Sequence, residues 1–242
     1  MDYFYNPDIV NGSLHLNEEE TRHCIRVLRK KPGDKIIVVD GQGGIYTCIL
    51  THMKGKQVKY EIYENVRISP PLNNIHISIA PTKNIERLEW FIEKSIEVGV
   101  RNISFIQCEN SERKKINLDR MLKKAISALK QSQNSYLPYL HDLVLFREFI
   151  NNADPDSVRL ICHANRGKDS FLLKVIDRRL EVIDRGTNYL VMVGPEGDFT
   201  SDELIMAEDA GFKPVSLGPA RLRTETAGLV ACILLNSLNT QV

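Results

Sequence analysis

The sequence lacks the features that would assign it quickly to a membrane, secreted or metal-binding class. No apolar stretch reaches the roughly eighteen residues that a membrane-spanning helix needs. The N-terminal residues Met1 to Tyr5 have neither the basic nor the apolar region of a secretory signal. The five cysteines are scattered without a CxxC pair, which argues against a disulfide framework and a zinc site. We therefore expect no metal and a cytoplasmic protein.

The fingerprints of several enzyme classes are also missing. There is no GxxxxGKS/T phosphate loop, no GxGxxG and no nucleophile elbow, which disfavours nucleoside triphosphate, dinucleotide and hydrolase sites. The formal net charge is only +1, so a nucleic-acid partner must be argued from local basic clusters. With 242 residues, 43% of them hydrophobic, the chain has the composition of a globular protein with one or two domains.

The first 70 residues predict a small β-barrel-like domain with one short helix, which starts at Asn17. Three strand patterns cover Lys35–Asp40, Ile45–His52 and Gln57–Asn65. The segment Pro70-Pro71-Leu72-Asn73-Asn74 then separates this β-rich region from a region of alternating strands and helices. We therefore divide the chain into domains 1–70 and 71–242.

Residues 71–242 predict an α/β domain, because strands and helices alternate there as in a parallel sheet with helices on its faces. About five strands are expected, at Ile75–Ala80, Ile103–Gln107, Val158–His163, Tyr189–Val193 and Pro214–Leu217. The helices are expected at Asn84–Val98, Ile116–Gln133, Phe171–Ile183, after Thr200 and after Ala227, with a turn at Asn165–Lys168. A hydroxyl at Thr200 and a carboxylate at Glu203 form a capping-box pattern at the start of one of them.

Two of these strands end in Gly-Pro turns, Gly194-Pro195-Glu196-Gly197 and Gly218-Pro219-Ala220. In a parallel sheet both turns lie at the carboxyl edge, where such folds bind ligands. Glycine lets the backbone approach a ligand closely, and proline stiffens the loop. The turns would suit a ligand read by backbone hydrogen bonds, such as an adenine ring. The alternative is that they only reverse the chain.

Val193–Phe199 and Leu217–Ala227 together resemble the two C-terminal motifs of SPOUT methyltransferases. More closely, the chain resembles the bacterial ribosomal RNA small subunit methyltransferase E family, which uses S-adenosylmethionine to methylate N3 of a uridine in 16S rRNA. The resemblance implies a C-terminal domain with a trefoil knot, an N-terminal PUA-like RNA-binding module and a homodimer. It implies 16S rRNA or the small ribosomal subunit as partner. Two alternatives remain: another RNA such as tRNA, or an inactive RNA-binding relative.

The resemblance also implies that three loops contact S-adenosyl-L-methionine. The cofactor-binding residues expected from it are Pro81, Thr82, Gly194, Pro195, Glu196, Gly197, Leu217, Gly218, Leu222, Arg223 and Thr224.

Methylation of a uridine at N3 requires removal of a weakly acidic proton. Arg223 is a candidate to favour the uridine anion, and Glu225 or Glu196 is a candidate to accept the proton. The alternative for Glu225 is a structural role, in which it caps the final helix and pairs with Arg223.

Two basic clusters are candidates for RNA contacts, because several cations together can neutralise several phosphates. The predicted RNA-binding residues are Arg22, His23, Arg26, Arg29, Lys30, Arg113 and Lys114. The alternatives are solvated charged faces and, for His23, a packed histidine. The chain departs from the family pattern at Asp2 and Tyr3, where many members have an arginine, and before Pro138, where another arginine is missing.

Overall fold

The structure, a computed structural model, describes residues 1–54, 57–163, 170–177 and 186–240. The predicted turn at Asn165–Lys168 and the second half of the predicted helix Phe171–Ile183 lie outside these residues. Contacts between Cα atoms divide the chain into two compact units. Unit 1 contains Met1–Pro70 and Ile126–Leu137, and unit 2 contains Pro71–Ala125 and Pro138–Val242.

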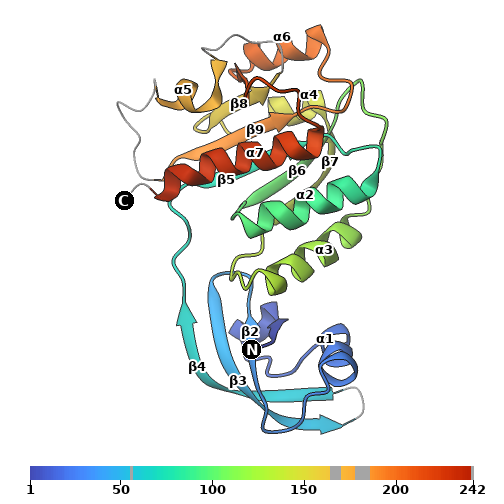
Figure 1. Ribbon diagram of the computed structural model, residues 1–242, viewed down its shortest axis with the longest axis vertical. Coiled ribbons are helices and arrows are strands. Elements are labelled where there is room, and N and C mark those ends of the chain that lie inside the picture. The colour runs from blue at the N-terminus through green and yellow to red at the C-terminus, as the bar shows by residue number, and fades with distance from the viewer. Residues whose placement is uncertain (55–56, 164–169, 178–185, 241–242) are drawn as a thin grey trace. The chain divides into compact units, whose positions relative to one another are not determined.

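Unit 1 is built on a four-stranded sheet of β1 (Tyr3–Tyr5), β2 (Lys35–Val39), β3 (Gly44–Lys54) and β4 (Gln57–Arg67). β1 runs parallel to β2, whereas β2, β3 and β4 are antiparallel neighbours (Figure 1). β1 and β4 are the edge strands of this sheet. Strand pairing therefore leaves the sheet open where the sequence suggested a barrel, because closure requires pairing between the first and last strands.

The short helix predicted from Asn17 is confirmed as α1 (Glu18–Arg22), and the Asn17 side chain accepts a hydrogen bond from an N–H of its first turn. A 3-10 turn at Pro7–Asn11 precedes α1, and a π-helical turn at His23–Val27 follows it directly. Cys24 in this turn packs into the core of unit 1 with residues of β1 to β4. The basic side chains on the opposite side of the turn are thereby left at the surface.

Helix α3 (Leu118–Gln131) contributes to both units, since its second half is grouped with unit 1. Its buried residues Met121, Ala125 and Leu129 lie four residues apart, and Leu129 packs against β2. Leu122 lies beside this buried stripe and is 39% exposed.

Unit 2 contains a six-stranded parallel sheet in the order β10-β8-β9-β5-β6-β7. Its strands are β5 (Asn74–Ile79), β6 (Asn102–Gln107), β7 (Tyr139–Leu145), β8 (Val158–Cys162), β9 (Asn188–Val193) and β10 (Lys213–Val215). The five predicted strands are confirmed, but β7 and the short helix α4 (Phe146–Asn151) were missed. β7 is an edge strand with no fully buried residue, so it lacks the apolar run that marks the inner strands.

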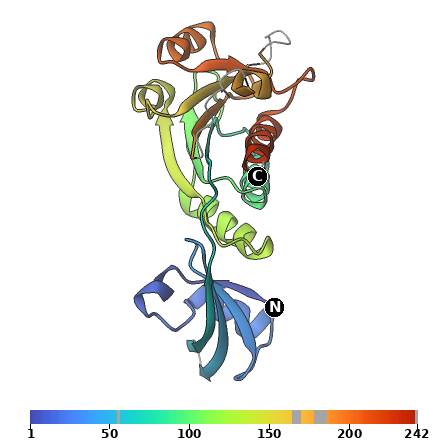
Figure 2. The same ribbon diagram turned by 90° about the vertical axis from the view of Figure 1, so that its left-hand side faces the viewer.

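Helices cover both faces of this sheet (Figures 1 and 2). α2 (Ile85–Glu97) and α7 (Thr224–Asn236) pack side by side on one face, with α5 (Leu172–Asp177) next to α7. α4 and α6 (Ser201–Asp209) pack on the other. α7 ends in a 3-10 turn, Ser237–Thr240. An added Cβ at Gly228 of α7 would lie 2.7 Å from the Phe91 ring of α2, so the glycine permits the close helix contact.

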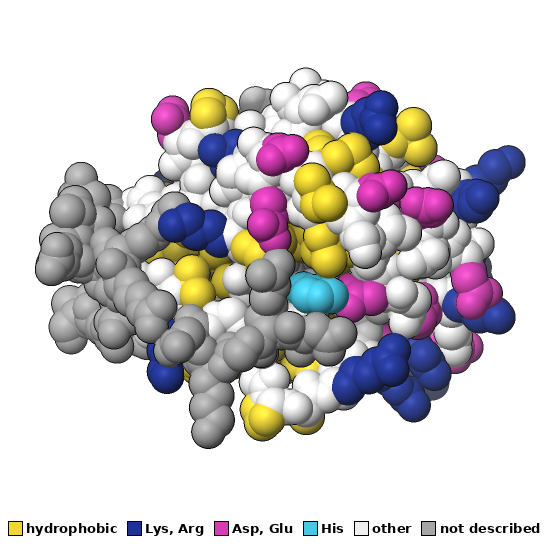
Figure 3. All heavy atoms as spheres, turned by 90° about the horizontal axis from the view of Figure 1, so that it is seen from above, with side chains coloured by type: hydrophobic (Ala, Val, Ile, Leu, Met, Phe, Trp, Pro, Cys, Tyr) yellow, Lys and Arg dark blue, Asp and Glu magenta, His cyan; other side chains and the backbone are white. Residues whose placement is uncertain are grey.

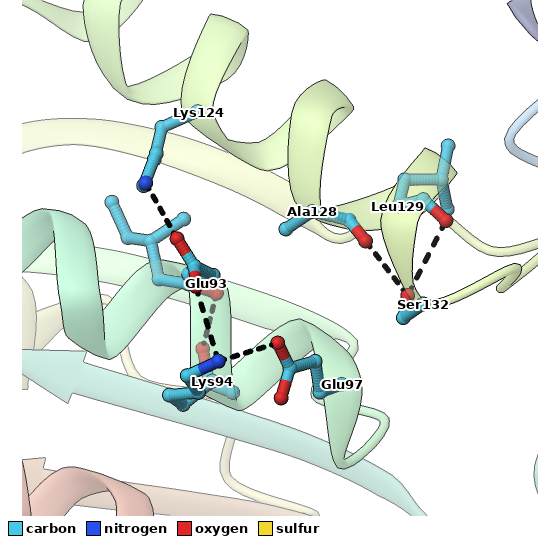
Figure 4. A network of polar contacts seen from close by, with 9 residues as sticks. Glu93, Lys94, Glu97, Lys124, Ala128, Leu129 and Ser132 are labelled. Carbon is cyan, nitrogen blue, oxygen red and sulfur yellow. Dashed lines mark hydrogen bonds and ion pairs between the residues drawn. The ribbon is translucent and has the colours of Figure 1, made fainter.

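Ion pairs link α2 to the first half of α3. Figure 4 shows the Glu93 carboxylate between the ammonium groups of Lys94 and Lys124, at 3.1 and 2.5 Å. The hydrogen bonds from Lys124 and Lys94 hold the pKa of the Glu93 carboxyl below its ordinary value. These pairs are partly exposed, so each contributes at most about 1 kcal/mol.

A stacked histidine pair on β5 and β7 makes unit 2 sensitive to acid. The rings of His76 and His141 lie 5.2 Å apart, and His76 Nε2 lies 2.8 Å from the Ser104 hydroxyl. Burial, with a smaller contribution from His141, lowers the pKa of His76 from 6.5 to about 4. The neutral ring is therefore favoured in the folded state.

We expect this pair to cost the protein roughly 3 kcal/mol of unfolding free energy as the pH falls from about 6.5 to about 4. The unfolded chain takes up the proton near the ordinary pKa, whereas folded His76 does so only near pH 4, so stability is lost across that window. Urea unfolding at pH 7 and pH 4.5 measures the loss, which His76→Gln should reduce. His52→Gln, at an exposed position on β3, is the control. An equal acid sensitivity in all three proteins would contradict the prediction.

Candidate functional site at the carboxyl edge of the sheet

A cavity of about 390 Å³ lies at the carboxyl ends of β8, β9 and β10. This volume falls within the range of roughly 300–1,000 Å³ that is usual for ligand sites. The space-filling view in Figure 3 shows hydrophobic side chains and a histidine beside acidic side chains on the upper face. Most of the predicted cofactor-binding residues line the cavity, namely Gly194, Pro195, Glu196, Leu217, Gly218, Leu222, Arg223 and Thr224.

The loop after β9 is held in place by its neighbours. The Lys83 N–H donates a hydrogen bond to Glu196 Oε1 at 2.9 Å, and Asn110 Nδ2 donates to two carbonyls of the loop at 3.3 and 3.1 Å. At Gly194 an added Cβ would lie 3.0 Å from the ring of Phe199. The cavity wall at this point is therefore bare backbone, fixed before any ligand arrives.

The loop after β10 turns around one serine. The Ser216 hydroxyl donates to the Gly218 carbonyl at 3.1 Å and lies 3.3 Å from the Gly218 N–H, which donates to it. Gly218 has φ +139°, a conformation that side chains rarely allow. Arg223 then precedes α7 without making a side-chain cap. The N-terminal N–H groups of α7 thus face the cavity side without a capping side chain, which favours negative charge there.

Three of the predicted cofactor residues do not line the cavity: Pro81, Thr82 and Gly197. Thr82 is fully buried, and the Arg113 guanidinium donates hydrogen bonds to the Thr82 and Lys83 carbonyls at 2.9 and 2.6 Å. The loop Pro81–Lys83 therefore supports the loop after β9 through the Lys83 N–H, which binds Glu196. The contacts predicted for these three residues with a cofactor, and the RNA contact predicted for Arg113, remain predictions.

Glu225 lies in the first turn of α7 and is only 6% exposed. Its Oε1 lies 3.9 Å from Nε of Arg87, and its Oε2 is buried with no hydrogen-bond partner among the described residues. The partner suggested by the sequence, Arg223, is replaced by Arg87, because helix α2 packs directly against α7. A buried acceptor without a partner costs about 1–3 kcal/mol, and more when charged. Glu225 itself does not line the cavity, but its neighbours Arg223 and Thr224 do.

Several cavity residues were not identified from the sequence: Arg87, Cys162, His163, Asp198 and Ser216. His163 Nδ1 lies 3.1 Å from Asp198 Oδ2, although the two residues are far apart in the chain. One feature of the sequence could have identified His163: it directly follows a buried strand, as the first Gly-Pro turn does. In the sheet these two strands, β8 and β9, are neighbours.

Some of the predicted RNA-binding side chains of unit 1 already have partners within the protein, and others are exposed to solvent. Lys30 is engaged by Asp2 at 2.6 Å, and this hydrogen bond raises the pKa of Lys30. Asp2 stands at a position where many family members have an arginine, and here it neutralises the charge of Lys30. His23 packs edge-on against Phe4, with ring centroids 6.1 Å apart. The exposed members of the set are Arg22, Arg26 and Arg29 in unit 1 and Lys114 in unit 2.

Within the described ranges, no group of three or more His, Cys, Asp or Glu side chains is arranged to hold a metal ion. The helices of that same part of the chain are too short or too polar to cross a membrane.

The parallel sheet and the cavity between its glycine loops define an α/β domain that binds a small ligand at its carboxyl edge. Residues 69–236 match the family model of the RNA methyltransferase domain, and residues 16–63 match that of the RNA methyltransferase PUA domain. The chain therefore belongs to the RNA methyltransferase family and carries its PUA domain.

Relatives and solved structures confirm the resemblance seen in the sequence. The chain is 28% identical to "Ribosomal RNA small subunit methyltransferase E" of Aquifex aeolicus over 246 residues, which cover 98% of this chain and 100% of that protein. A probable rRNA-methyltransferase from Porphyromonas gingivalis is similar with a TM-score of 0.87 and 36% identity, covering 99% and 98% of the two chains. The enzyme of Neisseria gonorrhoeae, solved bound to S-adenosyl methionine, has a TM-score of 0.85 and 29% identity, covering 98% of each chain.

Proposed function

We propose that this protein transfers a methyl group from S-adenosyl-L-methionine to N3 of a uridine in 16S rRNA, and so acts in the cytoplasm. The observation that carries the proposal is the cavity between the two glycine loops, in a chain of the RNA methyltransferase family. The solved relative from Neisseria gonorrhoeae, bound to S-adenosyl methionine, supports this choice of cofactor.

The residues present fit such a cofactor. The bare backbone at Gly194 and Gly218 allows a flat base to approach closely. Arg87 and Arg223 line the cavity and are suited to a carboxylate, and the carboxylates of Glu196 and Asp198 are suited to cationic groups. When bound, S-adenosylmethionine supplies a methyl group activated by the positive charge on its sulfur.

The protein residues must align the uridine with the methyl group and remove the proton from its N3. Alignment alone contributes up to about 7–11 kcal/mol in favourable systems. Arg223, exposed at the cavity, is placed to stabilise the uridine anion. Of the two proposed proton acceptors, Glu196 already accepts from the Lys83 N–H through Oε1, whereas Glu225 Oε2 has no partner among the residues that the structure describes. Because Glu225 directly follows the cavity residue Thr224, we favour Glu225 as the base.

The proposal includes a trefoil knot in the C-terminal segment and a homodimer. In support of the knot, β10 returns to pair with β8 while α7 crosses back over β5 and β9. In support of the homodimer, α7 is apolar along most of its length, and its Ile233 side chain is 45% exposed.

The direct test uses S-adenosylmethionine with a labelled methyl group, small ribosomal subunits that lack the modification, and nucleoside analysis of the product. The expected result is 3-methyluridine in 16S rRNA. Label in tRNA but not in 16S rRNA would favour the alternative substrate. Cofactor binding without transfer to any RNA would favour an inactive RNA-binding relative.

Two exposed arginines, Arg26 in the π-helical turn and Arg29 just after it, should carry part of the RNA affinity. We expect Arg26→Glu with Arg29→Glu to weaken RNA binding at least about tenfold and to lower the salt dependence by roughly two phosphate contacts. Filter binding at several salt concentrations measures both. Lys123→Glu with Lys213→Glu, two exposed lysines of unit 2, controls for the change of net charge. If the control weakens binding equally, these two arginines have no specific role.

A further inference from the structure

The order of the strands places one side chain between the two glycine loops. β8 lies between β9 and β10 in the sheet, and the loops follow β9 and β10. A ligand held by both loops must therefore pass over the carboxyl end of β8. Cys162 ends that strand, and His163, the next residue, lines the cavity.

Asp198 orients the His163 ring. Its Oδ2 lies 3.1 Å from His163 Nδ1, and its Oδ1 accepts a hydrogen bond from the Phe199 N–H at 2.8 Å. Asp198 has φ +63°, a costly conformation for a residue other than glycine, and Asn110 holds its carbonyl at 3.1 Å. The Phe199 N–H thus holds the carboxylate, and Asn110 holds the backbone of the same residue.

This arrangement fixes the chemical character of the free ring nitrogen. A carboxylate next to Nδ1 keeps the proton of the neutral ring on Nδ1, which leaves Nε2 as an acceptor. Within the described part of the chain, His163 Nε2 has no hydrogen-bond partner. Among the described residues, the cavity therefore presents an acceptor without a partner directly after β8, the strand that lies between β9 and β10.

We propose that His163, held by Asp198, accepts a hydrogen bond from a ribose hydroxyl of the bound S-adenosyl nucleoside. The inference rests on the proposed function, because it takes the cofactor as the ligand of this cavity. In that molecule the ribose lies between the adenine and the sulfur, so in a pose that spans both loops it would lie near an acceptor between them. Its hydroxyl groups are the donors that an acceptor at this point requires.

The experiment is a calorimetric titration with S-adenosylhomocysteine and its 2′-deoxy and 3′-deoxy analogues. Wild-type protein should bind at least one deoxy analogue about five- to tenfold more weakly than S-adenosylhomocysteine. His163→Phe, which keeps a flat ring but removes the acceptor, should bind S-adenosylhomocysteine about five- to tenfold more weakly and lose the discrimination. Asp198→Asn keeps the residue's size but lets the ring take its other tautomer, so it should also lose most of the discrimination.

A variant that fails to fold would be recognised by the absence of a normal unfolding transition. Asp198→Asn then provides a second, independent test of the contact with the ribose hydroxyl. Equal losses for all three nucleosides in His163→Phe would overturn the inference, because the ring would then only shape the cavity or contact the adenine. Unchanged discrimination in both variants would overturn it as well. In either of these cases the proposed function stands, whereas a wild-type protein that binds no S-adenosyl nucleoside overturns both.

Discussion

Gly218→Val is expected to lower the affinity for S-adenosylmethionine about 100-fold. Gly218 has φ +139°, and a β-branched residue cannot adopt this conformation without strain of about 1–3 kcal/mol. Relief of the strain would move the loop out of its two hydrogen bonds with Ser216 and displace the wall that Leu217 to Thr224 form. Each 1.4 kcal/mol lost corresponds to a factor of ten in the dissociation constant, which calorimetric titration measures.

A matched control is available in unit 1. Gly33 has φ +92° and, like Gly218, nothing within 4 Å of an added Cβ. Gly33→Val should therefore destabilise the fold by a similar amount and leave the affinity for the cofactor unchanged. Normal affinity in Gly218→Val would show that this loop does not bind the cofactor. Equal losses in both variants would assign the effect to stability alone.

Local signals predicted the elements that surround the site. The capping box at Thr200 is present, with the Thr200 hydroxyl accepting from the Glu203 N–H and Glu203 accepting from the Thr200 N–H. Such contacts lie within one turn of helix, so a segment of four residues, Thr200 to Glu203, suffices to specify them. β7 was missed because pairing with β6 holds it, and that pairing is invisible in a seven-residue segment containing His141 and Asp142.

The same distinction, between local signals and contacts that depend on the whole fold, holds for the site. The two glycine loops were predicted because each carries its own signal, a sharp turn after a buried strand. His163 and Arg87 were not, because their position depends on the order of strands and the packing of helices, which periodicity does not reveal. The Arg87–Glu225 contact joins α2 to α7 across 138 residues of sequence. Only the folded chain brings these charges to one cavity.

Glu225→Gln is expected to lower the rate of methyl transfer about 100-fold or more, the usual contribution of a general base. Affinity for S-adenosylmethionine should change by less than about threefold, because Glu225 itself does not line the cavity. Glutamine keeps the size of the side chain and a carbonyl oxygen near Arg87 but cannot accept the N3 proton. Single-turnover transfer to 16S rRNA and calorimetric titration separate the two effects.

The alternative for Glu225 is purely structural and makes a different prediction. If the carboxylate only stabilises the first turn of α7 and balances Arg87, Glu225→Gln will lower the unfolding free energy and the rate together. Raising the pH would then not restore transfer in the variant, since no proton acceptor has been lost. If Glu225 is the base, transfer by the variant should rise with pH as the uridine loses its N3 proton to solvent. Glu196→Gln, at the exposed carboxylate that holds Lys83, is the matched comparison: a larger loss there would move the base to Glu196.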